Sequence, residues 1–317
     1  MWQAMCRRFC GIGWRGAQRW WLLLLLVAEP VGCREGGGVE SPTTGEATIA
    51  ADISLKPAIE PVLEQFHRVY PRAHLRVVYT SEEAAVQGLL ADSFKVALVT
   101  RPYRAQDSAA LAEQKIRPKL TPIVREGIAI VAHPACPDSL LILDTLRAWL
   151  LRKDSPYGFV IEGGSGSGIL RHLRDSLLGG QMPQAKLYRA DSAPAVLKYV
   201  QENPRFLGLI GAAWVCDREA EVTHKFLGPA RVVALSAEGK NYYHPYAGYL
   251  DPRFYPLSRL VYALNREPRM GVASSFVSYL AGPDGQRILL KSELRPVNAP
   301  IRVVELKERA IEIERGK

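Results

Sequence analysis

The chain has 317 residues, of which 48% are apolar and 23% are charged, and its formal net charge is +9. This composition can bury a substantial core and is typical of a globular protein with two domains. No block of Lys and Arg and no aromatic-basic motif is present, which argues against a nucleic-acid partner. The cysteines and histidines form no Cys-x-x-Cys pair or cluster, so the sequence predicts no metal site and no cofactor.

The first 33 residues differ from the rest of the chain. Four arginines precede the apolar run Trp20–Ala28, and Cys33 follows Gly32. A basic start and an apolar stretch too short to span a bilayer comfortably are typical of an export signal. Gly32-Cys33 resembles the lipobox of bacterial lipoproteins, whose cysteine is lipidated, although Pro30 stands where leucine is usual. Ordinary signal cleavage, or retention as a membrane anchor, stays open.

Residues 34–45 are rich in Gly, Ser, Thr and Pro and show no apolar period, which predicts a flexible tether. Four Arg and one Glu precede Cys33, which leaves 37 basic and 31 acidic residues from there on. This excess of positive charge suits a small anionic ligand or a membrane surface. We therefore expect a soluble domain that is held at a membrane by one end.

From residue 47 onward, apolar periodicity predicts strands that alternate with helices. The expected strands are 47–51, 74–79, 95–99, 119–123, 127–132, 157–161, 186–189, 206–210, 231–235 and 301–306. The expected helices are 56–70, 80–90, 106–114, 140–151, 169–178, 193–201, 270–280 and 283–291. Such alternation indicates an α/β fold with parallel or mixed sheets covered by helices.

Hydroxyl groups follow two of these strands directly. At Asp52-Ile53-Ser54, Ser54 is placed to cap the next helix, which carries Pro57 in its first turn. Thr100-Arg101 puts a hydroxyl and a guanidinium at the end of a buried strand, where ligands bind in open α/β sheets. An arginine there is suited to bidentate contact with an oxyanion. Taken singly, a plain helix cap explains the first junction, and a surface ion pair explains the second equally well.

A third junction is the glycine-serine loop 163–168, which separates the strand 157–161 from the helix 169–178. Its glycines let the backbone approach a ligand, and unpaired N–H groups at the helix start attract anions. The loop matches neither a P-loop nor a dinucleotide fingerprint. It is no hydrolase elbow either, because Ser167 rather than glycine stands two residues after Ser165. A flexible connector or a helix cap remains the simple alternative.

The order and spacing of these junctions resemble the phosphate-binding proteins that serve ABC-type phosphate importers, in a divergent lipoprotein-like branch. The resemblance covers residues 47–306 and is carried by segments 52–57, 99–102, 165–180, 208–211, 255–259 and 280–286. It implies a type II periplasmic-binding-protein (Venus flytrap) fold, in which two α/β domains with mixed sheets are joined by two hinge crossings. The first domain would then comprise 46–125 and 250–310, the second 126–249, with crossings at 125–132 and 243–250.

The resemblance also implies that phosphate binds in the cleft between the domains, without catalysis. The contacts would come from Ser54, Thr100, Arg101, Ser165, Gly166 and Ser167, with Ile53 and Asp52 beside them. Relatives commonly carry an arginine four residues before the first loop serine, where this chain has Ile161. Asp52 or Glu162 would then be the candidates to accept the proton of hydrogen phosphate.

The protein implied by this resemblance is a periplasmic monomer, tethered by a lipid on Cys33, that passes phosphate to the membrane subunits of an ABC importer. Tungstate, molybdate or sulfate stays open as the ligand. A serine hydrolase that uses Ser165 or Ser167, and an envelope interaction protein that kept the fold but lost the ligand, stay open as other functions. Cys136 and Cys216 are either paired, as an exported protein allows, or buried free thiols.

Overall fold

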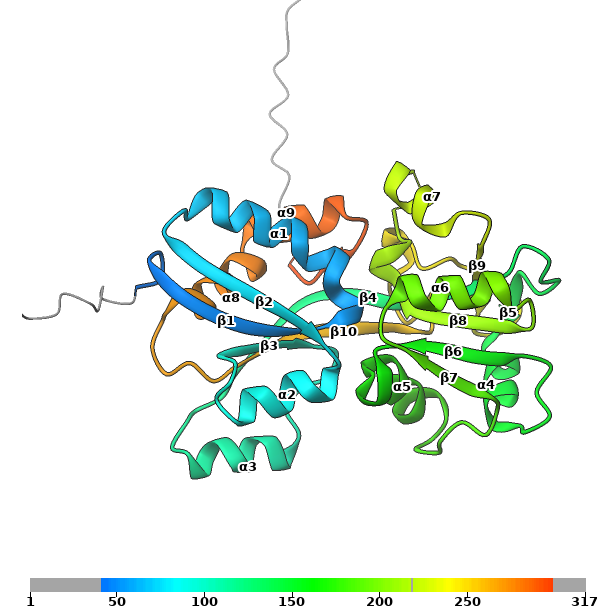
Figure 1. Ribbon diagram of the computed structural model, residues 1–317, viewed down its shortest axis with the longest axis horizontal. Helices are drawn as coiled ribbons and strands as arrows, with labels where there is room; N and C mark the ends of the chain where they lie inside the picture. The colour runs from blue at the N-terminus through cyan, green and yellow to red at the C-terminus, as the bar shows by residue number, and fades with distance from the viewer. Residues whose placement is uncertain (1–40, 218, 299–317) are drawn as a thin grey trace, which may run out of the picture. The chain divides into compact units, whose positions relative to one another are not determined.

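The computed structural model describes residues 41–217 and 219–298, in which strands and helices alternate (Figure 1). The strands are β1 (Gly45–Asp52), β2 (Ala73–Thr80), β3 (Val96–Val99), β4 (Lys119–Ala132), β5 (Leu140–Ile142), β6 (Gly158–Glu162), β7 (Leu187–Ala190), β8 (Phe206–Gly211), β9 (Arg231–Ser236), β10 (Ser258–Asn265) and β11 (Arg295–Pro296). The helices are α1 (Lys56–Val69), α2 (Glu82–Leu90), α3 (Ala105–Glu113), α4 (Leu143–Leu151), α5 (Gly168–His172), α6 (Ala193–Glu202), α7 (Glu221–Leu227), α8 (Val272–Ala281) and α9 (Pro283–Lys291). None of the helices in this described part is long and apolar enough to cross a membrane.

The first lobe is built on β1, which pairs in parallel with β2 and β3, while β3 pairs antiparallel with β10. Successive side chains of β1 point to opposite faces of the sheet. Ile49 and Ala51 therefore join one core cluster with α1, α8 and α9, whereas Ala50 joins another with α2. Figure 1 shows α1 and α9 on one side of these strands and α2 and α3 on the other. The sheet of this lobe is thus covered on both faces.

The second lobe follows the same principle. β6 pairs in parallel with β7 and β8, and β9 pairs with β4 and β5. Ile128 and Ile130 of β4 pack in a cluster with α4 and α5, whereas Ala129 and Val131 pack in a cluster with α6. The Gly163–Ser167 loop leads from the end of β6 to the start of α5.

One strand, β4, belongs to both lobes. Its residues 119–127 pair antiparallel with β10, and its residues 128–132 pair antiparallel with β8. At the change of partner, a Cβ on Gly127 would lie 3.0 Å from Cδ2 of Leu250 and 3.3 Å from Cε1 of Tyr255. Leu250 packs in the core of the first lobe and Tyr255 in the core of the second, so the chain returning from β9 contacts both cores here.

Some local predictions were wrong. The runs 119–123 and 127–132 form one strand, because residues 124–126 continue the pairing with β10. Residues 140–142, predicted to begin a helix, form β5, because they pair in parallel with β9. Ser54 does not cap α1: its N–H bonds Oδ1 of Asp52 in a 3-10 turn, and the residue before α1 makes no side-chain cap. β10 and α7 were not predicted at all.

Other predictions concern the chain outside this range. The export signal of residues 1–33 with Cys33, most of the tether 34–45, and the strand 301–306 lie outside the described residues. The two body cysteines lie inside it, and both are free and buried in different core clusters, so they do not pair. Burial raises the pKa of the Cys216 thiol to about 12, which keeps it protonated and unreactive.

Candidate functional site

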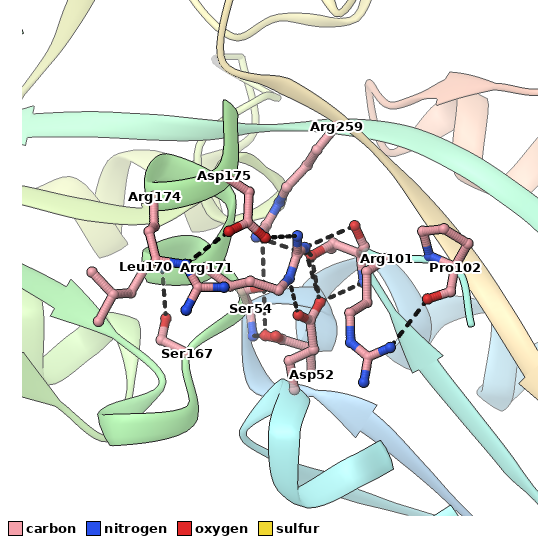
Figure 2. Close-up of polar contacts among 12 residues, drawn as sticks. Asp52, Ser54, Arg101, Pro102, Ser167, Leu170, Arg171, Arg174, Asp175 and Arg259 are labelled. Atoms are coloured by element: carbon pink, nitrogen blue, oxygen red, sulfur yellow. Dashed lines mark hydrogen bonds and ion pairs between the residues drawn. The ribbon is translucent and has the colours of Figure 1, made fainter. Parts of the chain in front are cut away.

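The carboxyl ends of β1, β3 and β6 meet where the two lobes contact each other. β1 ends at Asp52, β3 is followed by Thr100, and β6 ends at Glu162 before the glycine-serine loop. In α/β sheets, this edge is where ligands bind. Figure 2 shows side chains of both lobes directed toward one another here, with Arg171 of the second lobe close to residues of the first lobe.

Glu82, the first residue of α2, lies at the centre of these contacts and is only 2% exposed. Its Oε2 accepts the N–H of Thr100 at 2.8 Å and the hydroxyl of Thr100 at 2.6 Å. From the second lobe, Arg171 donates Nε to Oε1 and, at 3.4 Å, Nη2 to Oε2. Burial alone would raise the pKa of Glu82, but the Arg171 charge and these hydrogen bonds lower it overall. The carboxylate is therefore ionised, and its ion pair joins the lobes.

Arg259 on β10 is a second buried guanidinium. It donates Nε to Oε1 of Glu126 at 2.7 Å and Nη2 to the hydroxyl of Ser54 at 2.8 Å. The Ser54 hydroxyl in turn donates to Oδ1 of Asp52 at 2.7 Å. Arg171 and Arg259 both approach the Thr100 hydroxyl, at 3.0 and 3.4 Å. One connected network therefore links the ends of β1 and β3 to the middle of β4.

This network contains more carboxylates than guanidiniums. Oδ2 of Asp52 and Oε2 of Glu126 are buried without a hydrogen-bond partner among the described residues. Burial raises the pKa of Asp52, and it raises the pKa of Glu126 to about 7 although Arg259 lowers it. The network therefore contains two buried oxygens without a hydrogen-bond partner, while its donors are engaged.

The hydrogen bonds of Glu162 all lie within the second lobe. Its two carboxylate oxygens accept the N–H groups of Ala193 and Gly211, each at 3.0 Å. The backbone carbonyl of Glu162 accepts the Ser167 hydroxyl, and Ser167 also caps α5 by accepting the N–H of Leu170 at 3.5 Å. Both oxygens of Glu162 are thus in use, whereas Asp52 keeps one free.

A cavity of about 190 Å³ adjoins the Glu82–Arg171 pair, between the glycine-serine loop and the first lobe. It is lined by Glu82, Glu83, Arg104, Ser165, Gly166, Ser167, Leu170, Arg171, Arg174, Met182 and Arg189. Four arginines face two glutamates, so the wall carries a net positive charge that attracts anions. A larger, more open hollow of about 670 Å³ lies over the other ends of β1 and β2, beside Thr48 and Arg76, and contains no predicted site residue.

The structure places the predicted site residues in different surroundings. Asp52, Ser54 and Thr100 lie in the buried network, Ser165, Gly166 and Ser167 line the cavity, and Ile53 is half-buried in the turn after β1. Arg101 points elsewhere: its Nη1 contacts Oδ2 of Asp107 at 2.5 Å and the carbonyl of Pro102 at 3.1 Å, as Figure 2 shows for Pro102. Arg101 therefore makes none of these interlobe contacts.

Four residues of the network were not predicted as site residues: Glu82, Glu126, Arg171 and Arg259. A charge inside an apolar strand pattern, as at Glu126, is the signal that could have found one of them, because a buried charge needs a partner. Arg171 and Arg259 fall inside segments that carry the family resemblance, but nothing in the residues around them says that they are buried. Within residues 41–217 and 219–298, no group of three or more His, Cys, Asp or Glu could hold a metal ion.

Residues 38–284 match the family model of the PBP superfamily domain. A similar solved structure, assigned as a phosphate ABC transporter substrate-binding protein from Clostridium perfringens with bound phosphate, shares 17% identity at a TM-score of 0.64, over 80% of this chain and 100% of that one. An ABC-type phosphate transport receptor from Vibrio cholerae shares 15% at a TM-score of 0.57, over 80% and 100%. The CcmR regulatory domain of Synechocystis in complex with 2-PG shares 14% at a TM-score of 0.53, over 75% and 96%.

No curated protein matches the sequence. At these identities the solved structures establish the fold, which is shared by transport receptors and a regulatory domain alike. The predicted fold class, a type II periplasmic-binding-protein fold with mixed sheets flanked by helices, is confirmed. Because the family model spans most of the sequence, the chain belongs to the PBP superfamily.

Proposed function

We propose that this protein binds inorganic phosphate between its lobes and delivers it to the membrane subunits of an ABC importer. The observation that carries the proposal is the cavity of about 190 Å³ in which Ser165, Gly166 and Ser167 face four arginines from both lobes. The Ser165 hydroxyl and guanidiniums from both lobes are donors that suit an oxyanion. An anion that contacts both lobes favours the closed form through those contacts.

Arg171 is the cation that we assign to the ligand. The resemblance leads one to expect an arginine at position 161, where this chain has isoleucine, and Arg171 reaches the same loop from α5. It lines the cavity and is 15% exposed at its side chain, so a ligand in the cavity can contact it. Arg171 would thus take the role that relatives give to an arginine at the position of Ile161. The departure at Ile161 is therefore compatible with oxyanion binding.

Selectivity for phosphate would come from the free acceptor on Asp52. Its Oδ2 has no hydrogen-bond partner among the described residues, but Asp52 does not line the cavity and this oxygen is buried against the Gly168 backbone, so phosphate would reach it only where the lobes separate at Gly168. Hydrogen phosphate can donate a proton to such an acceptor, whereas sulfate has none to donate and would leave it unpaired. We therefore expect phosphate to bind more tightly than sulfate, molybdate or tungstate.

The wider organisation is part of the proposal. Residues 1–33 would direct export, with Cys33 as lipid attachment site, and residues 34–45 would tether a monomeric, periplasmic binding domain to the membrane. The first domain would comprise 46–125 and 250–310, and the second 126–249. Ser165 accepts or donates no hydrogen bond within the described residues, and the Ser167 hydroxyl bonds a backbone carbonyl, so neither serine is paired with a base. This supports binding over hydrolysis.

A thermal-melt series on the full-length chain in detergent micelles tests the proposal. Phosphate, sulfate, molybdate and tungstate would be compared at equal concentration. A ligand present at one hundred times its Kd stabilises the folded state by about 2.7 kcal/mol, which raises the melting temperature measurably. We expect a rise with phosphate and little or none with sulfate. A melting temperature that no oxyanion changes would contradict the proposal.

A second candidate function is an envelope interaction protein that keeps the fold without a ligand. One observation favours it: Glu82 already takes the hydrogen bonds of Thr100 and Arg171. This candidate predicts that none of the four oxyanions shifts the melt, either for the natural chain or for a variant that lacks the Glu82 charge.

A further inference from the structure

A carboxylate of the chain itself accepts the hydrogen bonds that a bound oxyanion would need. Glu82 receives a backbone N–H and a hydroxyl from Thr100, at 2.8 and 2.6 Å, and a guanidinium from Arg171. A backbone N–H, a hydroxyl and a guanidinium make up the donor set with which proteins hold phosphate oxygens. Glu82 therefore occupies the position of an anion within the site.

The same carboxylate joins the lobes. Glu82 belongs to α2 of the first lobe and Arg171 to α5 of the second, and the pair is buried on the Glu82 side. The second lobe comes so close that a Cβ on Gly168 would lie 2.9 Å from Oε2 of Glu82 and 2.5 Å from Oδ2 of Asp52. The lobes are thus in contact around an internal anion.

Arg171 also lines the cavity beside this pair, together with Ser165 and Gly166. It can therefore turn from the carboxylate of Glu82 to an anion in the cavity while it stays between the lobes. The Thr100 hydroxyl belongs to the same contact, because it donates to Glu82 at 2.6 Å and accepts from Arg171 at 3.0 Å. An anion that enters the cavity therefore finds Arg171 already paired with Glu82, and it is repelled by the negative charge of Glu82.

We infer that Glu82 is an internal competitor of the anionic ligand. Glu82 holds the lobes together through Arg171 until phosphate replaces it as the partner of Arg171. The inference rests on the proposed phosphate-binding function and adds to it the residue that sets the affinity. Two effects of Glu82, the competition for donors and the repulsion of a second anion, both weaken phosphate binding. Neutralising Glu82 should therefore strengthen it.

Isothermal titration of the full-length chain with inorganic phosphate tests this inference. The variants are Glu82→Gln and, as a matched comparison, Glu83→Gln. Glu83 also lines the cavity, but among the described residues its side chain accepts a hydrogen bond only from Gln87, at 3.0 Å, and none from Thr100 or Arg171. Both variants are compared by their Kd for phosphate, and we expect the Kd of Glu82→Gln to be at least about tenfold lower than the Kd of Glu83→Gln. Equal gains would show that only the general loss of negative charge matters, which would overturn the inference.

Hydrogen exchange measured by mass spectrometry supplies a second readout without ligand. Peptides that cover residues 163–171 should exchange faster in Glu82→Gln than in the natural chain, and phosphate should restore their protection. Unchanged exchange would contradict the role of Glu82 in joining the lobes. If Glu82→Gln does not fold, Glu82→Asp withdraws the carboxylate by one methylene and should also lower the Kd.

The outcomes separate this inference from the function on which it rests. Phosphate binding by the natural chain that becomes weaker or stays unchanged in Glu82→Gln and Glu82→Asp would refute the exchange and leave the proposed function standing. Absence of phosphate binding in the natural chain and in every variant would refute the proposed function itself.

Discussion

At the scale of single residues, Gly168 shows how closely the lobes approach. An added Cβ would lie 2.5 Å from Oδ2 of Asp52 and 2.9 Å from Oε2 of Glu82. Ser54 holds the Asp52 carboxylate by donating to its other oxygen, Oδ1, and Thr100 donates to Oε2 of Glu82. Because neither carboxylate can move freely, we expect Gly168→Ala to lower the free energy of unfolding by about 1–3 kcal/mol. Urea unfolding at neutral pH measures this change.

The control for this substitution is Gly248→Ala. An added Cβ on Gly248 would meet no atom of the described residues within 4 Å, and its backbone is not left-handed, so alanine should change the free energy of unfolding by less than about 0.5 kcal/mol there. If both substitutions change the free energy of unfolding equally, the lobes can move apart at Gly168 without cost, and the close contact there does not stabilise the fold.

Single residues also show what the sequence could and could not predict of the site. The hydroxyls at the ends of β1 and β3 were predicted, because position in a strand-to-helix junction is visible in the sequence. The choice between arginines was not. Arg101 looks better placed than Arg259, yet Asp107, six residues further on, binds Arg101 locally at 2.5 Å. Arg259 reaches Ser54, 205 residues away in the chain, because β10 lies between β3 and β4.

At the scale of elements, β4 carries a buried charge in the middle of a strand. Glu126 is fully buried, and its pKa is raised by burial to about 7 although Arg259 lowers it; Asp52 and Glu82 raise it further. In the unfolded chain this carboxyl titrates near 4.5. The folded state therefore holds a proton that the unfolded state has lost, and stability present below about pH 4.5 is lost as the pH rises through about 7.

Replacement of Glu126 by Gln tests this. Between pH 5 and 8 the free energy of unfolding of the natural chain should fall by up to about 3 kcal/mol from Glu126 alone, since each pKa unit corresponds to about 1.4 kcal/mol. Glu162, whose pKa burial also raises to about 7, adds to the fall. Below about pH 6.5 His172 opposes it, because burial lowers its pKa to about 3. Glu126→Gln should flatten the profile, and an unchanged slope would refute the assignment.

The elements themselves were largely visible in the apolar pattern, and their failures have a common cause. Residues 140–142 and 258–265 form strands because they pair with β9 and with β3 and β4, which lie far away in the sequence. Local periodicity contains no information about such partners. That residues 119–123 and 127–132 form one strand could not be predicted for the same reason. Arg125 and Glu126 interrupt the apolar run, but the backbone continues to pair with β10.

At the scale of the whole molecule, the fold does not decide the function, because the same architecture serves phosphate receptors and a regulatory domain. The function is instead inferred from the contact between the lobes. An ion pair between Glu82 and Arg171 joins them there, beside the buried pair of Arg259 and Glu126 within the first lobe. If the Glu82–Arg171 pair only held the lobes together, removing either member should have similar effects on phosphate binding.

The exchange of Glu82 for phosphate predicts opposite effects instead. Arg171→Met leaves the buried Glu82 charge without its cation, so the melting temperature of the ligand-free chain should fall by several degrees. It also removes the guanidinium that we assign to the ligand, so the Kd for phosphate should rise by about tenfold or more, whereas Glu82→Gln should lower it. Arg174→Met is the comparison, because Arg174 lines the same cavity but pairs with the exposed Asp175. Titration of the three variants with phosphate decides the question. Kd values that change in the same direction in Arg171→Met and Glu82→Gln would show a purely structural ion pair. Kd values that change in opposite directions would show that Arg171 binds the anion and that Glu82 takes its place when no ligand is bound.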